Sequence, residues 1–166
     1  IETRIERETG RRPIVAGNWK MHKTTGEAES LARELVSTLK EGKNRYMIAP
    51  PFTALAAVSP IVAGSNILLG AQNMAPALEG AHTGEVSVAM LKDLGVQVAI
   101  LGHSERRHEY GESDELIRQK VDLALQEGVE VILCVGETLE EREAGSVQKV
   151  VESQLTAGLE NVAEAL

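Results

Sequence analysis

Five short apolar runs, each followed by a segment with the pattern of an amphipathic helix, constrain the fold of this chain more than any other feature. The runs predict buried strands and lie at residues 13–20, 46–49, 67–72, 96–101 and 129–135. Strict alternation of strands and helices predicts right-handed βαβ crossovers and a parallel sheet. We therefore expect an α/β fold with about five βα units.

Apolar spacing and capping residues mark the helices between these runs. The spacing predicts helices at residues 26–41, 88–94 and 114–126 and through most of the chain from residue 138 onward. Ser87 is expected to cap the helix over 88–94. Thr53 is expected to cap a further short helix, and Pro60 should disturb the end of that helix.

Polar side chains follow four of the five predicted strands. They are Asn18 and Lys20 after the first strand, Gln72 and Asn73 after the third, His103, Ser104 and Glu105 after the fourth, and Glu137 after the fifth. Parallel barrels place reactive groups beyond the carboxyl ends of their strands. A doubly wound sheet would be expected to carry a glycine-rich phosphate turn, and neither GxGxxG nor GxxxxGK[ST] occurs in the sequence. The pattern favours parallel β/α barrel units.

Charge and composition narrow the function classes. Seventeen Lys and Arg against 25 Asp and Glu give a net charge of −8, which argues against a general nucleic-acid surface but allows a small anionic substrate beside one local cation. The apolar stretches are far shorter than the roughly 18 residues of a membrane span. The first residues lack the apolar segment of a signal peptide. The single cysteine, Cys134, allows no intrachain disulfide, and we interpret it as a packing residue. These features predict a cytoplasmic protein.

The length of 166 residues suits one domain with a substantial core. Residues 1–12 are charged and show no apolar periodicity, so we interpret them as a tail or linker. Residues 13–166 contain all the predicted strands and helices and form the predicted domain.

Six segments of this domain resemble the triosephosphate isomerase family in their order and spacing. They are AGNWKMHK (16–23), PPFT (50–53), LGAQN (69–73), HTGEVS (82–87), LGHSERR (101–107) and CVGETLEERE (134–143). The resemblance implies a TIM barrel and a cofactor-independent isomerase. Such an enzyme interconverts dihydroxyacetone phosphate and D-glyceraldehyde 3-phosphate in glycolysis and gluconeogenesis, as a cytoplasmic homodimer.

The sequence departs from the family pattern in extent. A complete barrel takes about 250 residues, whereas five βα units are present here. The family's catalytic glutamate lies on the sixth strand in a motif of the form YEPVWAIG, which has no match in the sequence. We therefore expect a truncated barrel that is inactive alone. Its exposed sheet edges and uncovered interior predict self-association. The alternatives are a non-catalytic half-barrel that needs a complementary C-terminal half, and, less favoured, another phosphate-handling barrel.

The resemblance also assigns roles to residues at the strand ends. His103 would polarise the substrate carbonyl, Lys20 would place a cation near the substrate oxygens and phosphate, and Asn18 would bind substrate or orient Lys20. Glu105 would pair with Lys20, and Ser104 and Cys134 would support the site. Taken alone, each has an ordinary interpretation: a structural histidine, a solvated lysine, a turn asparagine, or an acid favoured by a helix N-terminus.

The irregular segment Met74–Gly84 has a length that is usually functional or interfacial in compact domains. It resembles the family's interdigitating loop, so Thr83 would contact the site of a partner subunit. Glu85 and Arg106 are candidates for an ion pair between subunits, and Gln72 is a further candidate for the interface. No metal site is expected, because His22, His82 and His108 lack neighbours at ligand spacing.

Overall fold

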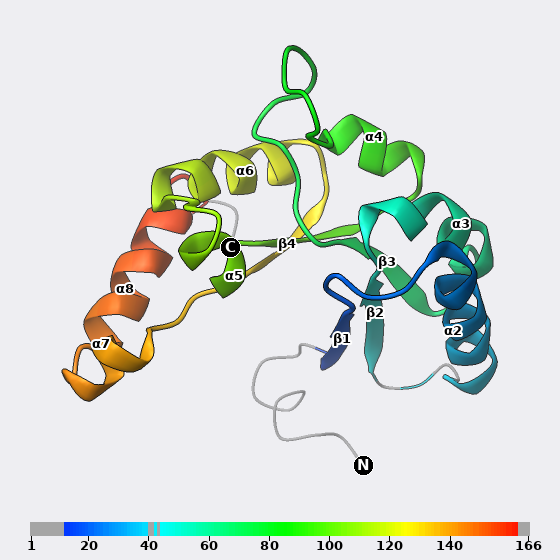
Figure 1. Cartoon of the computed structure of the whole chain (residues 1–166), viewed down its shortest axis with the longest axis horizontal. Helices are drawn as coiled ribbons and strands as arrows, with labels where there is room; N and C mark the ends of the chain where they lie inside the picture. Colours follow the sequence, from blue (N-terminus) through cyan, green and yellow to red (C-terminus); the bar gives the residue numbers. More distant parts are fainter. Residues whose placement is uncertain (1–11, 40–41, 43, 163–166) are drawn as a thin grey trace. The chain divides into compact units, whose positions relative to one another are not determined.

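The computed structural model describes residues 12–39, 42 and 44–162 (Figure 1). The strands among them are β1 (Ile14–Asn18), β2 (Arg45–Ala49), β3 (Ile67–Ala71), β4 (Val98–Leu101) and β5 (Glu130–Leu133). The helices are α2 (Thr25–Thr38), α3 (Phe52–Val62), α4 (Val88–Asp93), α5 (Ser104–His108), α6 (Asp114–Gln126), α7 (Leu139–Glu143) and α8 (Val147–Gly158). Of the predicted tail, residues 1–11 lie outside the described part.

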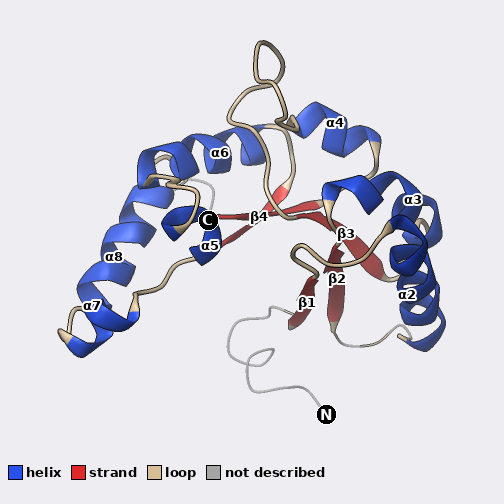
Figure 2. Ribbon diagram, viewed as in Figure 1, coloured by secondary structure: helices blue, strands red, loops and turns tan. Residues whose placement is uncertain are grey.

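The strands follow the chain order β1-β2-β3-β4-β5 in one sheet, and helices alternate with them along the chain (Figure 2). β1 pairs with β2 in parallel, with Ile14 opposite Arg45, and β2 pairs with β3 in parallel, with Tyr46 opposite Ile67. Adjacent, sequential, parallel strands joined by helices are the repeating unit of a β/α barrel. The predicted fold class of about five parallel βα units is confirmed.

The chain forms two compact units, which we describe separately. The first unit comprises residues up to 72 together with 91–98, and the second comprises 73–90 and 99–166. Each has its own apolar core. The first buries Met47, Leu55, Val58, Ile67, Leu69 and Leu91, and the second buries Met74, Val88, Ile100, Leu101, Ile117 and Val121.

In the first unit, α2 and α3 pack against each other. Ala28 and Ala32 of α2 are fully buried, and such small side chains let helices approach closely. α2 begins with a capping box, in which Glu27 Oε2 accepts from the Thr24 backbone N–H at 2.8 Å. Hydrogen bonds from Thr24 lower the pKa of Glu27. The helix ends at Thr38 rather than at 41, and residues 40 and 41 lie outside the described ranges.

The predicted N-cap of α3 is wrong. Pro51, not Thr53, occupies the N-cap position. Its carbonyl oxygen accepts from the Ala54 N–H at 2.9 Å, so the first turn closes on backbone without a capping side chain. The helix passes through Pro60 and ends two residues later at Val62. Pro60 has no N–H to donate to the preceding turn, so its position near the end of the helix agrees with the expected disturbance there.

In the second unit, serine side chains cap α4 and α6. Ser87 Oγ accepts from the Met90 N–H at 3.4 Å, as predicted, and Ser113 Oγ accepts from the Leu116 N–H at 3.2 Å. α6 has the predicted bounds. α8 lies close to β5, since a Cβ built at Gly158 would stand 2.8 Å from Leu133 Cδ2.

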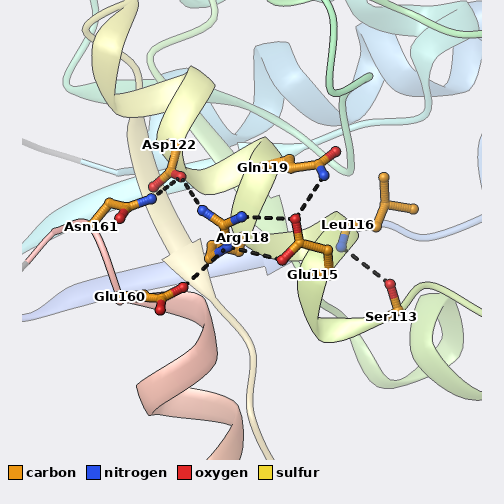
Figure 3. A network of polar contacts seen from close by, with 8 residues as sticks. All are labelled: Ser113, Glu115, Leu116, Arg118, Gln119, Asp122, Glu160 and Asn161. Atoms are coloured by element: carbon orange, nitrogen blue, oxygen red, sulfur yellow. Dashed lines mark hydrogen bonds and ion pairs between the residues drawn. The ribbon is translucent and has the colours of Figure 1, made fainter.

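Arg118 links α6 to the chain that follows α8 (Figure 3). Its guanidinium donates to Glu115 at 2.7 and 3.1 Å and to Asp122 at 3.1 Å, and its Nε lies 3.5 Å from Glu160 Oε2. Asn161 Nδ2 donates to Asp122 Oδ2 at 2.7 Å. The hydrogen bond from Arg118 lowers the pKa of Glu115. One side chain therefore contacts three carboxylates at the α6–α8 surface.

Replacing Arg118 by Gln is expected to lower the urea midpoint of unfolding, because three carboxylates lose their shared cation. The difference from the unsubstituted chain should shrink in about 1 M salt, where the Debye length falls to about 3 Å. Urea titrations at low and high salt measure it, with Lys149→Gln on the exposed side of α8 as control. A difference that salt leaves unchanged would contradict an electrostatic origin.

Within the described ranges, no helix combines the length and the apolar character needed to cross a membrane.

Candidate functional site

In the first unit, the turn after β1 presents Lys20 in an unusual backbone conformation. Lys20 has φ +51°, in the left-handed region. The Asn18 side-chain oxygen accepts from the Lys20 N–H at 3.0 Å, which is the local hydrogen bond of an Asx turn. The Lys20 side chain is exposed. Asn18 therefore orients the Lys20 backbone, whereas its contact with a substrate stays a prediction.

Gln72 fixes the peptide that follows Lys20. Its Nε2 donates to Lys20 O at 2.9 Å and to Ala49 O at 2.8 Å, so it joins the ends of β1 and β2 from its position after β3. The sequence analysis predicted that Gln72 lies at a subunit interface, and that role stays a prediction. Its bridging role within the chain was not predicted, although its place at a strand end could have suggested it.

In the second unit, His103 occupies the N-cap of α5. Its Nδ1 accepts from the Glu105 N–H at 3.3 Å, and the Glu105 carboxylate lies 3.4 Å from the same nitrogen. One nitrogen cannot accept from the amide and donate to the carboxylate at once. We assign the lone pair of Nδ1 to the amide, because a backbone N–H has no alternative to donating. In this assignment the proton of the imidazole tautomer is on Nε2.

A cavity of about 250 Å³ adjoins His103. Its lining residues are Gly102, His103, Ser104, Arg107, Cys134, Val135, Gly136 and Glu137. Burial raises the pKa of the Cys134 thiol, and the charge of Arg107 opposes this only in part. The thiol is therefore protonated at neutral pH, which fits packing rather than nucleophilic chemistry.

Glu137 was noted in the sequence only as a residue past a strand end. Its Oε1 accepts from Arg142 Nε at 2.8 Å. The Glu137 backbone N–H and Arg142 hold the pKa of this carboxyl below its ordinary value. The cavity beside His103 therefore has an ionised carboxylate in its wall.

A buried ionic cluster joins Arg106 of α5 to Lys120 of α6 through Glu112, and the sequence analysis missed it. Lys120 Nζ donates to Glu112 Oε1 at 2.6 Å and to Asn73 Oδ1 at 3.0 Å, and Arg106 Nε donates to Glu112 Oε1 at 2.9 Å. The side chains of Lys120 and Glu112 are each 3% exposed. The sequence feature that could have revealed this cluster is Lys120, a charged residue next to Val121 on the apolar face of α6.

Several predicted interactions join residues of different units and stay predictions. Lys20 belongs to the first unit, whereas His103 and Glu105 belong to the second. Thr83 and Glu85 are exposed, as a contact with a partner subunit requires. Arg106, the predicted partner of Glu85, contacts Glu112 within this chain and lies 4.6 Å over the Tyr110 ring.

In the part of the chain that the structure describes, no group of three or more His, Cys, Asp and Glu side chains could hold a metal ion. His22, His82 and His108 stay without a predicted ligand role.

Comparison with known proteins adds an independent observation. A family model described as "Triosephosphate isomerase" matches residues 13–166. The chain belongs to the triosephosphate isomerase family. Among curated members, the triosephosphate isomerase of Treponema denticola is 61% identical over 148 residues, which are 89% of this chain and 59% of that protein. That of Treponema pallidum is 59% identical over 92% of this chain and 61% of its own length, and that of Carboxydothermus hydrogenoformans is 55% identical over the same shares.

The chain thus spans about three fifths of the length of these curated triosephosphate isomerases. The matched region contains every candidate residue named above, from Asn18 to Cys134.

Proposed function

We propose that this chain supplies the electrophile and the cation of a triosephosphate isomerase active site. The reaction would interconvert dihydroxyacetone phosphate and D-glyceraldehyde 3-phosphate without a cofactor. The observation that carries the proposal is the geometry of His103, whose Nδ1 accepts from the Glu105 N–H. That hydrogen bond leaves Nε2–H as the ring donor of His103, a residue that lines the cavity.

This isomerisation moves a proton between adjacent carbons through an enediolate. It needs a base for the C–H proton, donors for the oxygen on which charge develops, and a cation for the phosphate and oxyanion. Triosephosphate isomerase is itself the standard example of a neutral histidine acting as the donor. His103 would donate to the carbonyl oxygen, and Lys20 would supply the cation. Glu105 would hold Lys20 in place, and Asn18 would orient it.

The base that accepts the C–H proton would come from a part of the family's barrel that has no counterpart in these 166 residues. The family's glutamate motif, YEPVWAIG, has no counterpart among the 166 residues. A donor and a cation without a positioned proton acceptor give little turnover. We therefore expect the 166-residue polypeptide by itself to be inactive or nearly so.

We also propose that the site is completed across a cytoplasmic homodimer. The loop 74–84, which is exposed from residue 78 onward, would carry Thr83 toward the partner's site, and Glu85 and Arg106 would pair between subunits. Gln72 would adjoin this interface while holding Lys20. Exposure of Thr83 and Glu85 supports the proposal.

Complementation tests the proposed function. The polypeptide is mixed or co-expressed with the segment of the Treponema denticola relative that lies beyond the matched region, and isomerase turnover is measured. We expect turnover from the mixture and none from either part alone above a mock-purified control. Turnover by the 166-residue polypeptide alone would contradict the expected division of the site. A complex that forms, by sedimentation, but shows no turnover would contradict the proposed function.

A further inference from the structure

Arg107 makes a set of hydrogen bonds that the proposed reaction does not use directly. Its side chain is only 7% exposed. Nε donates to Gly102 O at 2.7 Å, Nη2 donates to Cys134 O at 3.0 Å, and Nη1 donates to Asp114 Oδ1 at 2.5 Å. The guanidinium thus has one carboxylate and two backbone carbonyls as acceptors, all in the second unit.

The two carbonyls lie at the ends of neighbouring strands. Gly102 directly follows β4 and precedes His103, and Cys134 directly follows β5. The Arg107 backbone N–H also donates to His103 O at 3.0 Å. The residue therefore holds the peptide on each side of His103, one through its side chain and one through its main chain.

The Arg107 guanidinium packs so closely against Gly102 that position 102 has no room for a side chain. Gly102 has φ +70°, and a Cβ at this position would stand 2.8 Å from Arg107 Nη2 and 3.1 Å from Cys134 O. Both the backbone conformation and the contact distance require glycine here. The close fit limits the orientations that the Gly102–His103 peptide can adopt.

We infer that Arg107 is a positioning residue for His103. By fixing the carbonyls of Gly102 and His103, it holds the imidazole where Nδ1 meets the Glu105 N–H, and so it fixes the proton on Nε2. The effect on the tautomer follows from the described contacts alone. The effect on turnover rests on the proposed function.

The planar guanidinium of arginine suits the positioning of His103, because it can donate to several acceptors at once. Three acceptors in different directions can be met by guanidinium N–H groups on separate nitrogens, whereas an ammonium is a compact point charge on a flexible stem. Arg107→Lys keeps the charge but cannot hold the three acceptors together. Asp114→Asn is a milder change, because it leaves both carbonyl contacts in place and weakens only the third.

The test measures the imidazole tautomer in the full 166-residue chain labelled with ¹⁵N-histidine. His103→Gln assigns the signal among the four histidines. In the unsubstituted chain we expect one dominant tautomer with the proton on Nε2. In Arg107→Lys we expect a mixture of the two tautomers, and in Asp114→Asn a smaller shift in the same direction.

Arg118→Lys is the matched control. It alters another arginine of the same unit, whose guanidinium contacts Glu115, Asp122 and Glu160 instead of the strand-end carbonyls of Gly102 and Cys134. We expect it to leave the His103 signal unchanged. If Arg107→Lys does not fold, Asp114→Asn decides the question. An unshifted tautomer in the folded variants would overturn the inference, and so would an equal shift in Arg118→Lys.

A kinetic measurement on the complemented enzyme separates this inference from the proposed function. We expect Arg107→Lys to lower kcat by about 100-fold, because a displacement of a catalytic group by about 1 Å can have an effect of this size, and we expect KM to change little. A shifted tautomer with an inactive unsubstituted complex would leave the positioning role standing and refute the proposed reaction. A shifted tautomer with an unchanged kcat would refute the catalytic importance of the positioning.

Discussion

Replacing His103 by glutamine is expected to lower kcat of the complemented isomerase by about 10²–10³-fold. Loss of one donor to a developing oxyanion has an effect of this order in enzymes. The reason here is that His103 Nε2–H is the donor left when Nδ1 accepts from the Glu105 N–H. A glutamine amide can donate a hydrogen bond, but it is not fixed by that contact, so it would not stand in for the imidazole.

Steady-state kinetics with either triose phosphate measure this effect. KM should change much less than kcat, because the donor acts mainly on the charge that develops in the transition state. His108→Gln is the matched control, since His108 is an exposed histidine on the same helix, α5. Equal losses in both variants, or a loss confined to KM, would contradict the role proposed for His103.

Replacing Lys120 by methionine is expected to lower the free energy of unfolding by about 3–5 kcal/mol, the usual cost of removing one partner from a buried ion pair. Methionine keeps much of the volume of the lysine stem. It leaves Glu112, whose side chain is 3% exposed, with one cation fewer. Urea unfolding of this variant beside Lys149→Met, an exposed lysine on α8, measures the difference. An equally small loss of unfolding free energy in both variants would show that the buried ion pair contributes little to stability.

The pH dependence of the Lys120 effect has a definite sign. Burial raises the pKa of Glu112, but the hydrogen bonds and charges of Lys120 and Arg106 outweigh it, so the pKa lies below the ordinary 4.5. A lowered carboxyl pKa stabilises the folded state above 4.5, and this stabilisation is lost as the pH falls from there through the folded-state pKa. The unsubstituted chain should therefore lose more stability in acid than Lys120→Met, and the two should converge.

Local patterns in the sequence were enough to predict the order of the elements. The bounds of α6 follow from the spacing of Ile117, Val121 and Ala124, and Ser87 was identified as a cap from its place before an apolar helical stretch. The cap of α3 was mispredicted because a threonine side chain was preferred over the carbonyl of Pro51. The error is local, since it moves the N-cap by two residues, from 53 to 51.

Only the site residues that directly follow predicted strands could be identified from the sequence. His103, Lys20 and Glu105 stand directly beyond apolar runs, so their candidacy needs no distant contact. The contacts that hold the site were not predictable in this way. Gln72 reaches Lys20 O across 52 residues, Arg107 reaches Cys134 O across 27, and Lys120 reaches Asn73 across 47. Periodicity carries no information about partners so far apart.

At the turn that carries Lys20, the requirement for stability and the requirement for the ammonium group favour different residues. An L-residue with a side chain in the left-handed region is disfavoured by about 1–2 kcal/mol, and glycine would remove that penalty. Two amide side chains keep the lysine there: Asn18 accepts from its backbone N–H, and Gln72 donates to its carbonyl oxygen. A directed-evolution screen for heat resistance alone would therefore enrich glycine at position 20 and discard the ammonium group, whereas the proposed function requires a growth selection on the complemented isomerase to retain it.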